Sequence, residues 1–74
     1  MYYDLIESGK RIKSLRKKHG YTQEALAEKL GVYPYTIWRI ENGKKGISVD
    51  LATELVVLFD TTLDYIFLGR ELQK

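Results

Sequence analysis

Residues 22–45 read TQEALAEKLGVYPYTIWRIENGKK, and this stretch decides the fold. Thr22 is an N-cap residue ahead of a run whose apolar side chains recur at helical spacing, and Gly31 is suited to end that run. Pro34 fits the first position of a new helix, because the N–H that proline lacks is unpaired there in any case. The stretch therefore predicts two short helices, one over 23–30 and one from Pro34 to the Asn42-Gly43 pair.

Three further helices are expected on either side of this stretch. One lies between Asp4 and Gly20 and begins with an Asp-x-x-Glu cap pattern. Ser48 caps another with a wide apolar face, and Thr61 or Thr62 caps a last short helix. No segment alternates with period two, so no strand is expected. The positions expected to face inward are Ile12, Leu15, His19, Leu26, Ala27, Leu30, Ile37, Ile40, Leu51, Ala52, Leu55, Val56, Phe59, Leu63, Ile66 and Phe67.

Length and composition indicate one small domain. The chain has 74 residues, no cysteine, 45% hydrophobic and 30% charged residues, which is typical of a folded rather than a disordered protein. No window approaches the roughly 18 apolar residues of a membrane span, and the first residues do not form a signal peptide. We therefore expect a cytoplasmic protein with no membrane partner, a domain over 1–69 and a tail over 70–74.

Charge is unevenly distributed along the chain. Residues 1–45 carry ten Lys and Arg against five Asp and Glu, whereas residues 46–74 carry two against five. A basic half indicates a polyanionic partner such as nucleic acid or a lipid surface. Charge alone fits a solvated helix face equally well.

The two short helices form a helix-turn-helix pattern around the corner at 31–33. Spacing alone favours a plain packing corner over a DNA-binding one. With Ile37 and Ile40 turned into the core at about 100° per residue, Tyr35 and Arg39 share the exposed face. This is the surface that a recognition helix presents. Trp38 lies at the edge of the inward stripe, so a core and a groove-facing placement are both open, and the core placement is slightly favoured.

The sequence resembles the phage repressor/Cro (XRE-type) helix-turn-helix family from about Gly9 to Gly69. The resemblance is carried by TQEALAEKLGV and RIENGK, preceded by RIKSLRKKHG and followed by ISVDLATELVVLFDTTLDYIF. It implies an all-α, five-helix, lambda-repressor-like domain that binds double-stranded DNA as a homodimer on an inverted repeat, with its third helix in the major groove. The implied function is transcriptional regulation, and repression by blocking polymerase is the simplest mechanism.

Four side chains of the third predicted helix are candidate base contacts: Pro34, Tyr35, Trp38 and Arg39. The planar fork of Arg39 can donate two hydrogen bonds to guanine O6 and N7. Tyr35 can offer a hydroxyl or pack on a thymine methyl group. Pro34 departs from the family, whose members often carry a polar base-reading side chain at this position. Proline offers only apolar contact, which narrows base readout and favours recognition of DNA shape.

Phosphate contacts, which fix the register on DNA without reading sequence, are expected from a second group of side chains. Gln23 lies at a helix N-terminus, where free N–H groups favour an anion, and the resemblance places a phosphate contact there. Tyr33 replaces the family's usual Ser or Thr N-cap, so the third helix loses a cap and gains a phenol within reach of a phosphate. The full set is Gln23, Tyr33, Thr36, Asn42, Lys44 and Lys45.

Two pairs of residues are expected to have structural roles. Glu41 falls about 40° from the inward direction of its helix and therefore needs a partner. The resemblance supplies Arg16, in an ion pair that ties the first helix to the third. Val57 and Leu58 enlarge the apolar face of the fourth helix. In the family this region often forms the dimer, so both residues are candidates for the dimer interface.

Other functions are less well supported by the sequence. No nucleophile with a base, paired acids or metal cluster is visible, so we expect no enzyme activity, cofactor, metal or small-molecule ligand. The main alternative is a protein-interaction module, antitoxin-like or targeting, that uses the apolar fourth and fifth helices. A membrane-surface helix over 10–18 has only Ile12 and Leu15 to insert. RNA binding lacks an evident aromatic stacking platform.

Overall fold

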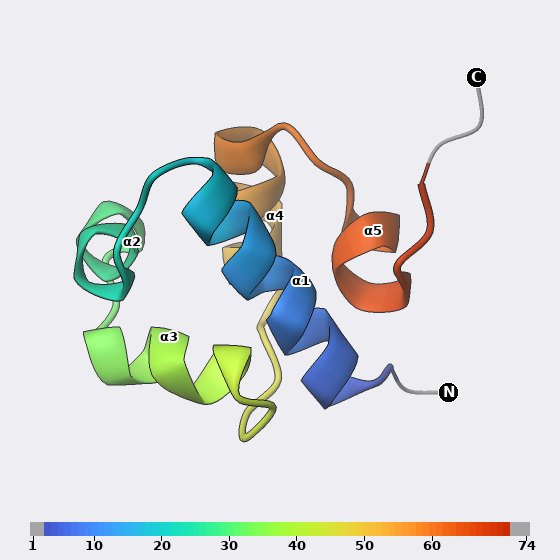
Figure 1. The fold of residues 1–74 in the computed structure, drawn as a ribbon, viewed down its shortest axis with the longest axis horizontal. Coiled ribbons are helices and arrows are strands. Elements are labelled where there is room, and N and C mark those ends of the chain that lie inside the picture. The colour runs from blue at the N-terminus through green and yellow to red at the C-terminus, as the bar shows by residue number, and fades with distance from the viewer. Residues whose placement is uncertain (1–2, 72–74) are drawn as a thin grey trace.

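A computed structural model describes residues 3–71, and this part of the chain contains five helices and no strand. The helices are α1 (Leu5–Lys18), α2 (Gln23–Leu30), α3 (Pro34–Glu41), α4 (Val49–Phe59) and α5 (Leu63–Leu68). α1 runs through the middle of the molecule, with α2 and α3 to one side, α5 to the other and α4 behind (Figure 1). The predicted all-α, five-helix fold is confirmed. None of these helices is long and apolar enough to cross a membrane.

Side-chain caps begin four of the five helices. In each case an oxygen of the cap residue accepts a hydrogen bond from a backbone N–H in the first turn, which satisfies a donor that has no partner within the helix. The cap residues are Asp4, Thr22, Ser48 and Thr62. α3 is the exception, because Tyr33 makes no side-chain cap and Pro34 occupies the start of the helix instead.

The hydrophobic core is built from one face of every helix. Its buried members are Ile12, Leu26, Ala27, Ile37, Ile40, Ile47, Ala52, Leu55, Phe59 and Ile66. Two inward predictions are wrong. Leu63 is 37% exposed, because the six-residue α5 buries Ile66 instead. His19 is exposed after the end of α1, where its ring stacks on Phe59 with ring centroids 4.8 Å apart.

Close backbone contact joins α1 to its neighbours. Gly9 is buried against the end of α3, and a Cβ atom there would collide with the carbonyl oxygen of Ile40 and lie 2.8 Å from that of Glu41. Only glycine allows α1 and α3 to approach so closely. On the other side of α1, the Ser8 hydroxyl donates to the Ile66 carbonyl over 2.7 Å and Arg11 donates to the same oxygen. α1 is thus the element that holds α3 and α5 in place.

Candidate DNA-binding surface

The corner between α2 and α3 sets the direction of α3. Gly31 has a left-handed backbone with φ of 73°, a conformation that glycine adopts without steric penalty. The next N–H, of Val32, donates to the Ala27 carbonyl over 3.0 Å and closes the end of α2. Because Ile37 and Ile40 are buried, the opposite face of α3 is left on the surface.

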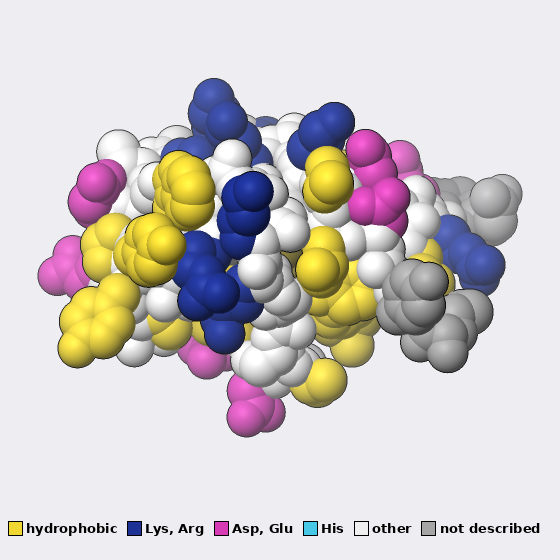
Figure 2. All heavy atoms as spheres, turned by 90° about the horizontal axis from the view of Figure 1, so that it is seen from below, with side chains coloured by type: hydrophobic (Ala, Val, Ile, Leu, Met, Phe, Trp, Pro, Cys, Tyr) yellow, Lys and Arg dark blue, Asp and Glu magenta, His cyan; other side chains and the backbone are white. Residues whose placement is uncertain are grey.

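Aromatic side chains crowd the exposed face of α3. Tyr33 is 82% exposed, Tyr35 66% and Trp38 41%, and Pro34 between them is exposed as well. The rings of Tyr35 and Trp38 lie nearly parallel, with centroids 5.7 Å apart and 10° between their planes. Trp38 therefore lies on the surface beside Tyr35, so the favoured core placement was wrong. Hydrophobic side chains gather at one end of the surface in Figure 2, with Lys and Arg side chains next to them.

Arg39 lies beside this aromatic pair. Its guanidinium carbon is 5.9 Å from the centroid of the Tyr35 ring, which is within the range of a cation–π contact. The side chain is half-buried, so its stem rests on the protein. Thr36 is also half-buried on this helix. The candidate base contacts Pro34, Tyr35, Trp38 and Arg39 thus lie together on α3.

The loop after α3 presents two exposed lysines, Lys44 and Lys45. The loop is held at both ends. The N–H of Lys44 donates to the Arg39 carbonyl over 2.8 Å, and the N–H of Ile47 donates to the Tyr3 hydroxyl over 3.0 Å. At Gly43 the chain packs closely against Ile6, where an added Cβ would lie 2.7 Å from an Ile6 side-chain carbon. The two positive charges are therefore carried by a fixed loop at the end of α3.

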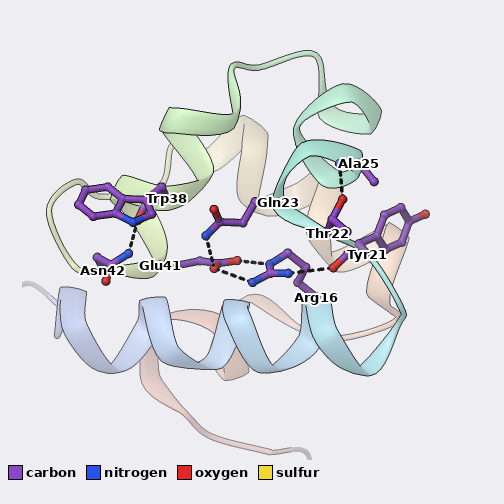
Figure 3. Close-up of polar contacts among 8 residues, drawn as sticks. All are labelled: Arg16, Tyr21, Thr22, Gln23, Ala25, Trp38, Glu41 and Asn42. Atoms are coloured by element: carbon purple, nitrogen blue, oxygen red, sulfur yellow. Dashed lines mark hydrogen bonds and ion pairs between the residues drawn. The ribbon is translucent and has the colours of Figure 1, made fainter.

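A buried polar network connects α1, α2 and α3 behind the exposed face (Figure 3). Arg16 Nε donates to Glu41 Oε2 over 2.6 Å and its Nη2 to Oε1 over 3.1 Å, so the pair is bidentate. The third donor, Nη1, bonds the Tyr21 carbonyl over 2.8 Å. The Glu41 side chain is only 1% exposed. The ion pair implied by the family resemblance is present, and its charge-assisted bonds are of the strong kind.

Gln23 also belongs to this network, which the sequence did not indicate. Its amide Nε2 donates to Glu41 Oε1 over 3.0 Å, and the side chain is half-buried. The start of α2 is thus linked to the end of α3. Asn42 is exposed, and its amide nitrogen donates to the Trp38 carbonyl over 2.8 Å. Both amides therefore have a bond within the domain, in addition to the phosphate contacts that we predict for them.

A second surface, on α4, carries the residues expected at a dimer interface. Val57 is 83% exposed, whereas Leu58 is partly buried and packs on the core. Together with Leu30 at the end of α2 they line a shallow, mainly apolar groove, which Lys29 and Glu54 border. Val57 is thus the apolar side chain on this surface that is most available to a partner.

The five-helix fold, the tight corner and the exposed face of α3 define a helix-turn-helix domain. Residues 12–66 match the model of the Helix-turn-helix family. The chain belongs to this family, in its XRE-type branch of DNA-binding transcription regulators.

Individual relatives agree with this assignment. An HTH-type transcriptional regulator of Methanocaldococcus jannaschii is 41% identical over 61 residues, which cover 82% of this chain and 92% of that protein. An HTH-type transcriptional regulatory protein of Pyrococcus furiosus is 42% identical over 55 residues, 74% of this chain but 18% of its own length. The chain thus spans under a fifth of such longer relatives. The crystal structure of the restriction-modification controller protein C.AhdI from Aeromonas hydrophila superposes with a TM-score of 0.76, at 28% identity over 86% of this chain and 97% of that one.

Proposed function

We propose that this domain binds a specific double-stranded DNA operator, with α3 in the major groove, and that it regulates transcription as a repressor. The observation that carries the proposal is the exposed face of α3, where Tyr35, Trp38 and Arg39 lie together beside the fixed Lys44 and Lys45 loop. A major groove about 12 Å wide admits a helix with such a face. Membership of the XRE-type helix-turn-helix family supports the same function.

Within this proposal, base readout and positioning are separate tasks. Arg39 donates to the O6 and N7 atoms of one guanine, and Pro34, Tyr35 and Trp38 make the remaining base contacts. The phosphate contacts come from side chains that border α3, and they fix its register on the duplex. These side chains are Gln23, Tyr33, Thr36, Asn42, Lys44 and Lys45.

The proposal includes a homodimer on an inverted repeat. Two copies related by a twofold axis place their α3 helices in successive major grooves, about one helical turn apart. The exposed Val57 and its neighbour Leu58 on α4 form the contact between the copies. In the cytoplasm, a dimer bound over a promoter represses transcription by blocking polymerase.

Selection from a random DNA library at one near-physiological salt concentration tests this function. The purified chain is expected to enrich an inverted repeat with half-site centres about ten base pairs apart. Affinity for that site should fall steeply as salt rises, because phosphate contacts release counterions. Enrichment of a single half-site would contradict the dimer, and no enrichment by a folded chain would contradict sequence-specific binding.

One observation favours a second candidate, a protein-interaction module. The groove at Leu30, Val57 and Leu58 offers apolar surface of the kind that interaction sites use. Such a module would hold its partner through Val57 and would be indifferent to DNA. Val57→Lys distinguishes the two: it abolishes partner capture by a module, whereas in a DNA-binding dimer it shifts the chain to monomers and weakens binding to the full repeat more than to a half-site.

A further inference from the structure

The exposed face of α3 offers a restricted set of contacts to base edges. Within Pro34–Glu41, Arg39 is the only side chain that can form a two-pronged donor to a base. Adenine is read by Asn or Gln and the amino group of cytosine by Asp or Glu. Glu41 is buried in its ion pair with Arg16, so no carboxylate of α3 is available. The amide nitrogens of Gln23 and Asn42 already donate to Glu41 and to the Trp38 carbonyl.

Besides the single polar groups of Tyr35, Thr36 and Trp38, apolar contact is the recognition chemistry that this face can supply. Tyr35 and Trp38 expose a nearly parallel pair of rings, whose faces are apolar while the phenol hydroxyl and the indole N–H lie at the ring edges. In the major groove the apolar group is the C5 methyl of a pyrimidine, as in thymine. 5-Methylcytosine presents the same group at the same place.

Resting on the proposed function, we propose that the Tyr35–Trp38 pair is a methyl reader, which recognises the C5 methyl of a pyrimidine close to the guanine held by Arg39. The distance between Arg39 and the Tyr35 ring sets the expected separation of the two bases. Arg39 Cζ lies 5.9 Å from the Tyr35 ring centroid, and successive base pairs are about 3.4 Å apart. The methylated pyrimidine and the guanine are therefore one or two base pairs from each other.

Base analogues test the methyl reader without altering base pairing. In the half-site obtained by selection, each thymine is replaced in turn by uracil, which lacks only the methyl group, and each cytosine by 5-methylcytosine. Binding is measured by fluorescence anisotropy at fixed salt. We expect one position per half-site at which the methyl group tightens binding by about fourfold, the factor equivalent to about 0.8 kcal/mol for one buried carbon. Loss on thymine-to-uracil exchange identifies thymine as the source, and a gain on cytosine methylation identifies 5-methylcytosine.

Protein variants show which side chains are responsible. Trp38→Ala and Tyr35→Ala are expected to bind the methylated and unmethylated sites equally. Tyr35→Phe is the matched control, because it keeps the ring, loses the hydroxyl and is expected to keep the fourfold preference. Circular dichroism verifies that each variant is folded. If Tyr35→Phe loses the preference, the aromatic ring does not suffice for recognition of the methyl group and the methyl reader is wrong.

The outcome separates this inference from the function on which it rests. A chain that selects a specific site but is insensitive to every methyl group overturns the methyl reader and leaves the proposed function intact. A folded chain that selects no site overturns both. Arg39→Ala identifies the guanine that Arg39 reads, because this variant no longer discriminates at that position. If the methyl preference lies more than two base pairs from that guanine, the proposed spacing between the two bases is wrong.

Discussion

The charged side chains on the two faces of α3 differ in how they are paired. Glu41 is almost wholly buried, accepts hydrogen bonds from Arg16 and Gln23, and joins three helices. The Arg39 guanidinium, two residues earlier, lies 5.9 Å from the centroid of the Tyr35 ring and donates no side-chain hydrogen bond within residues 3–71. A buried charge must be fully paired, whereas a charge kept for a partner must leave its donors free. One face of α3 is thus committed to the fold and the other is available for binding.

The largest expected effect comes from breaking the buried face. Glu41→Ala leaves the Arg16 guanidinium buried without its carboxylate, which should destabilise the domain by about 3–5 kcal/mol. Urea unfolding followed by circular dichroism measures the loss. Glu54→Ala, at an exposed site, is the control and should change stability by less than about 0.5 kcal/mol. The double variant Arg16→Met, Glu41→Leu should recover most of the lost free energy of unfolding, because no buried charge is left unpaired. If Glu41→Ala unfolds at the same urea concentration as the parent, the Arg16–Glu41–Gln23 network does not hold the helices together.

Gly9→Ala tests the backbone contact behind the same face. The added methyl meets the carbonyl oxygens of Ile40 and Glu41, so α1 and α3 must separate. We expect a loss of about 1–3 kcal/mol in urea unfolding. Alanine is the better helix former, so the same change without a clash would be stabilising. Ser14→Ala, on the exposed side of α1, introduces alanine without a clash. If both variants gain the same free energy of unfolding, the close approach of α1 and α3 is refuted.

On the exposed face, Arg39→Ala should change DNA binding and leave unfolding nearly unaltered. Loss of the guanine contact is expected to remove about 1–3 kcal/mol of discrimination at one base position. Lys44→Ala is the matched control: it should weaken all sequences alike and reduce the slope of log affinity against log salt by about 1. Competition assays on single-base variants of the operator measure both. Uniform weakening by both substitutions would mean that Arg39 reads no base.

The smallest effect is expected at the start of α3. Tyr33→Ser supplies the side-chain cap that α3 lacks and should stabilise the domain by about 0.5–1 kcal/mol. Thr22→Ala removes the cap of α2 and should destabilise it by about 1 kcal/mol. If Tyr33 contacts a phosphate, Tyr33→Ser becomes more stable and binds DNA more weakly. If stability and DNA affinity both rise, the phenol is dispensable for binding.

The helix boundaries could be predicted from the sequence because their causes are local. Asp4, Thr22 and Ser48 accept their hydrogen bonds from residues two or three positions ahead, so each cap is visible in a short stretch of sequence. Pro34 and Gly31 likewise act through their own backbone restrictions.

The placement of Trp38 and of the Gln23 amide depends on contacts that helical periodicity does not encode. Periodicity put Trp38 at the border of the inward stripe, and its stacking on Tyr35 decides the outcome. Gln23 bonds Glu41 eighteen residues away, which no local pattern indicates. Ile47 enters the core from a loop, where no repeat marks it. Side-chain pairing across elements is therefore the part that required the structure.

The anchored loop after α3 bears on the strength of the proposed DNA binding. Its backbone is held by Arg39 at one end and by the Tyr3 hydroxyl at the other, so Lys44 and Lys45 are already positioned before DNA arrives. A flexible loop would lose conformational entropy on docking, and each ordered side chain would subtract from affinity. On the proposed function, Tyr3, which is far from α3 in sequence, contributes to DNA affinity by holding this loop rigid through its contacts with Gly46 and Ile47.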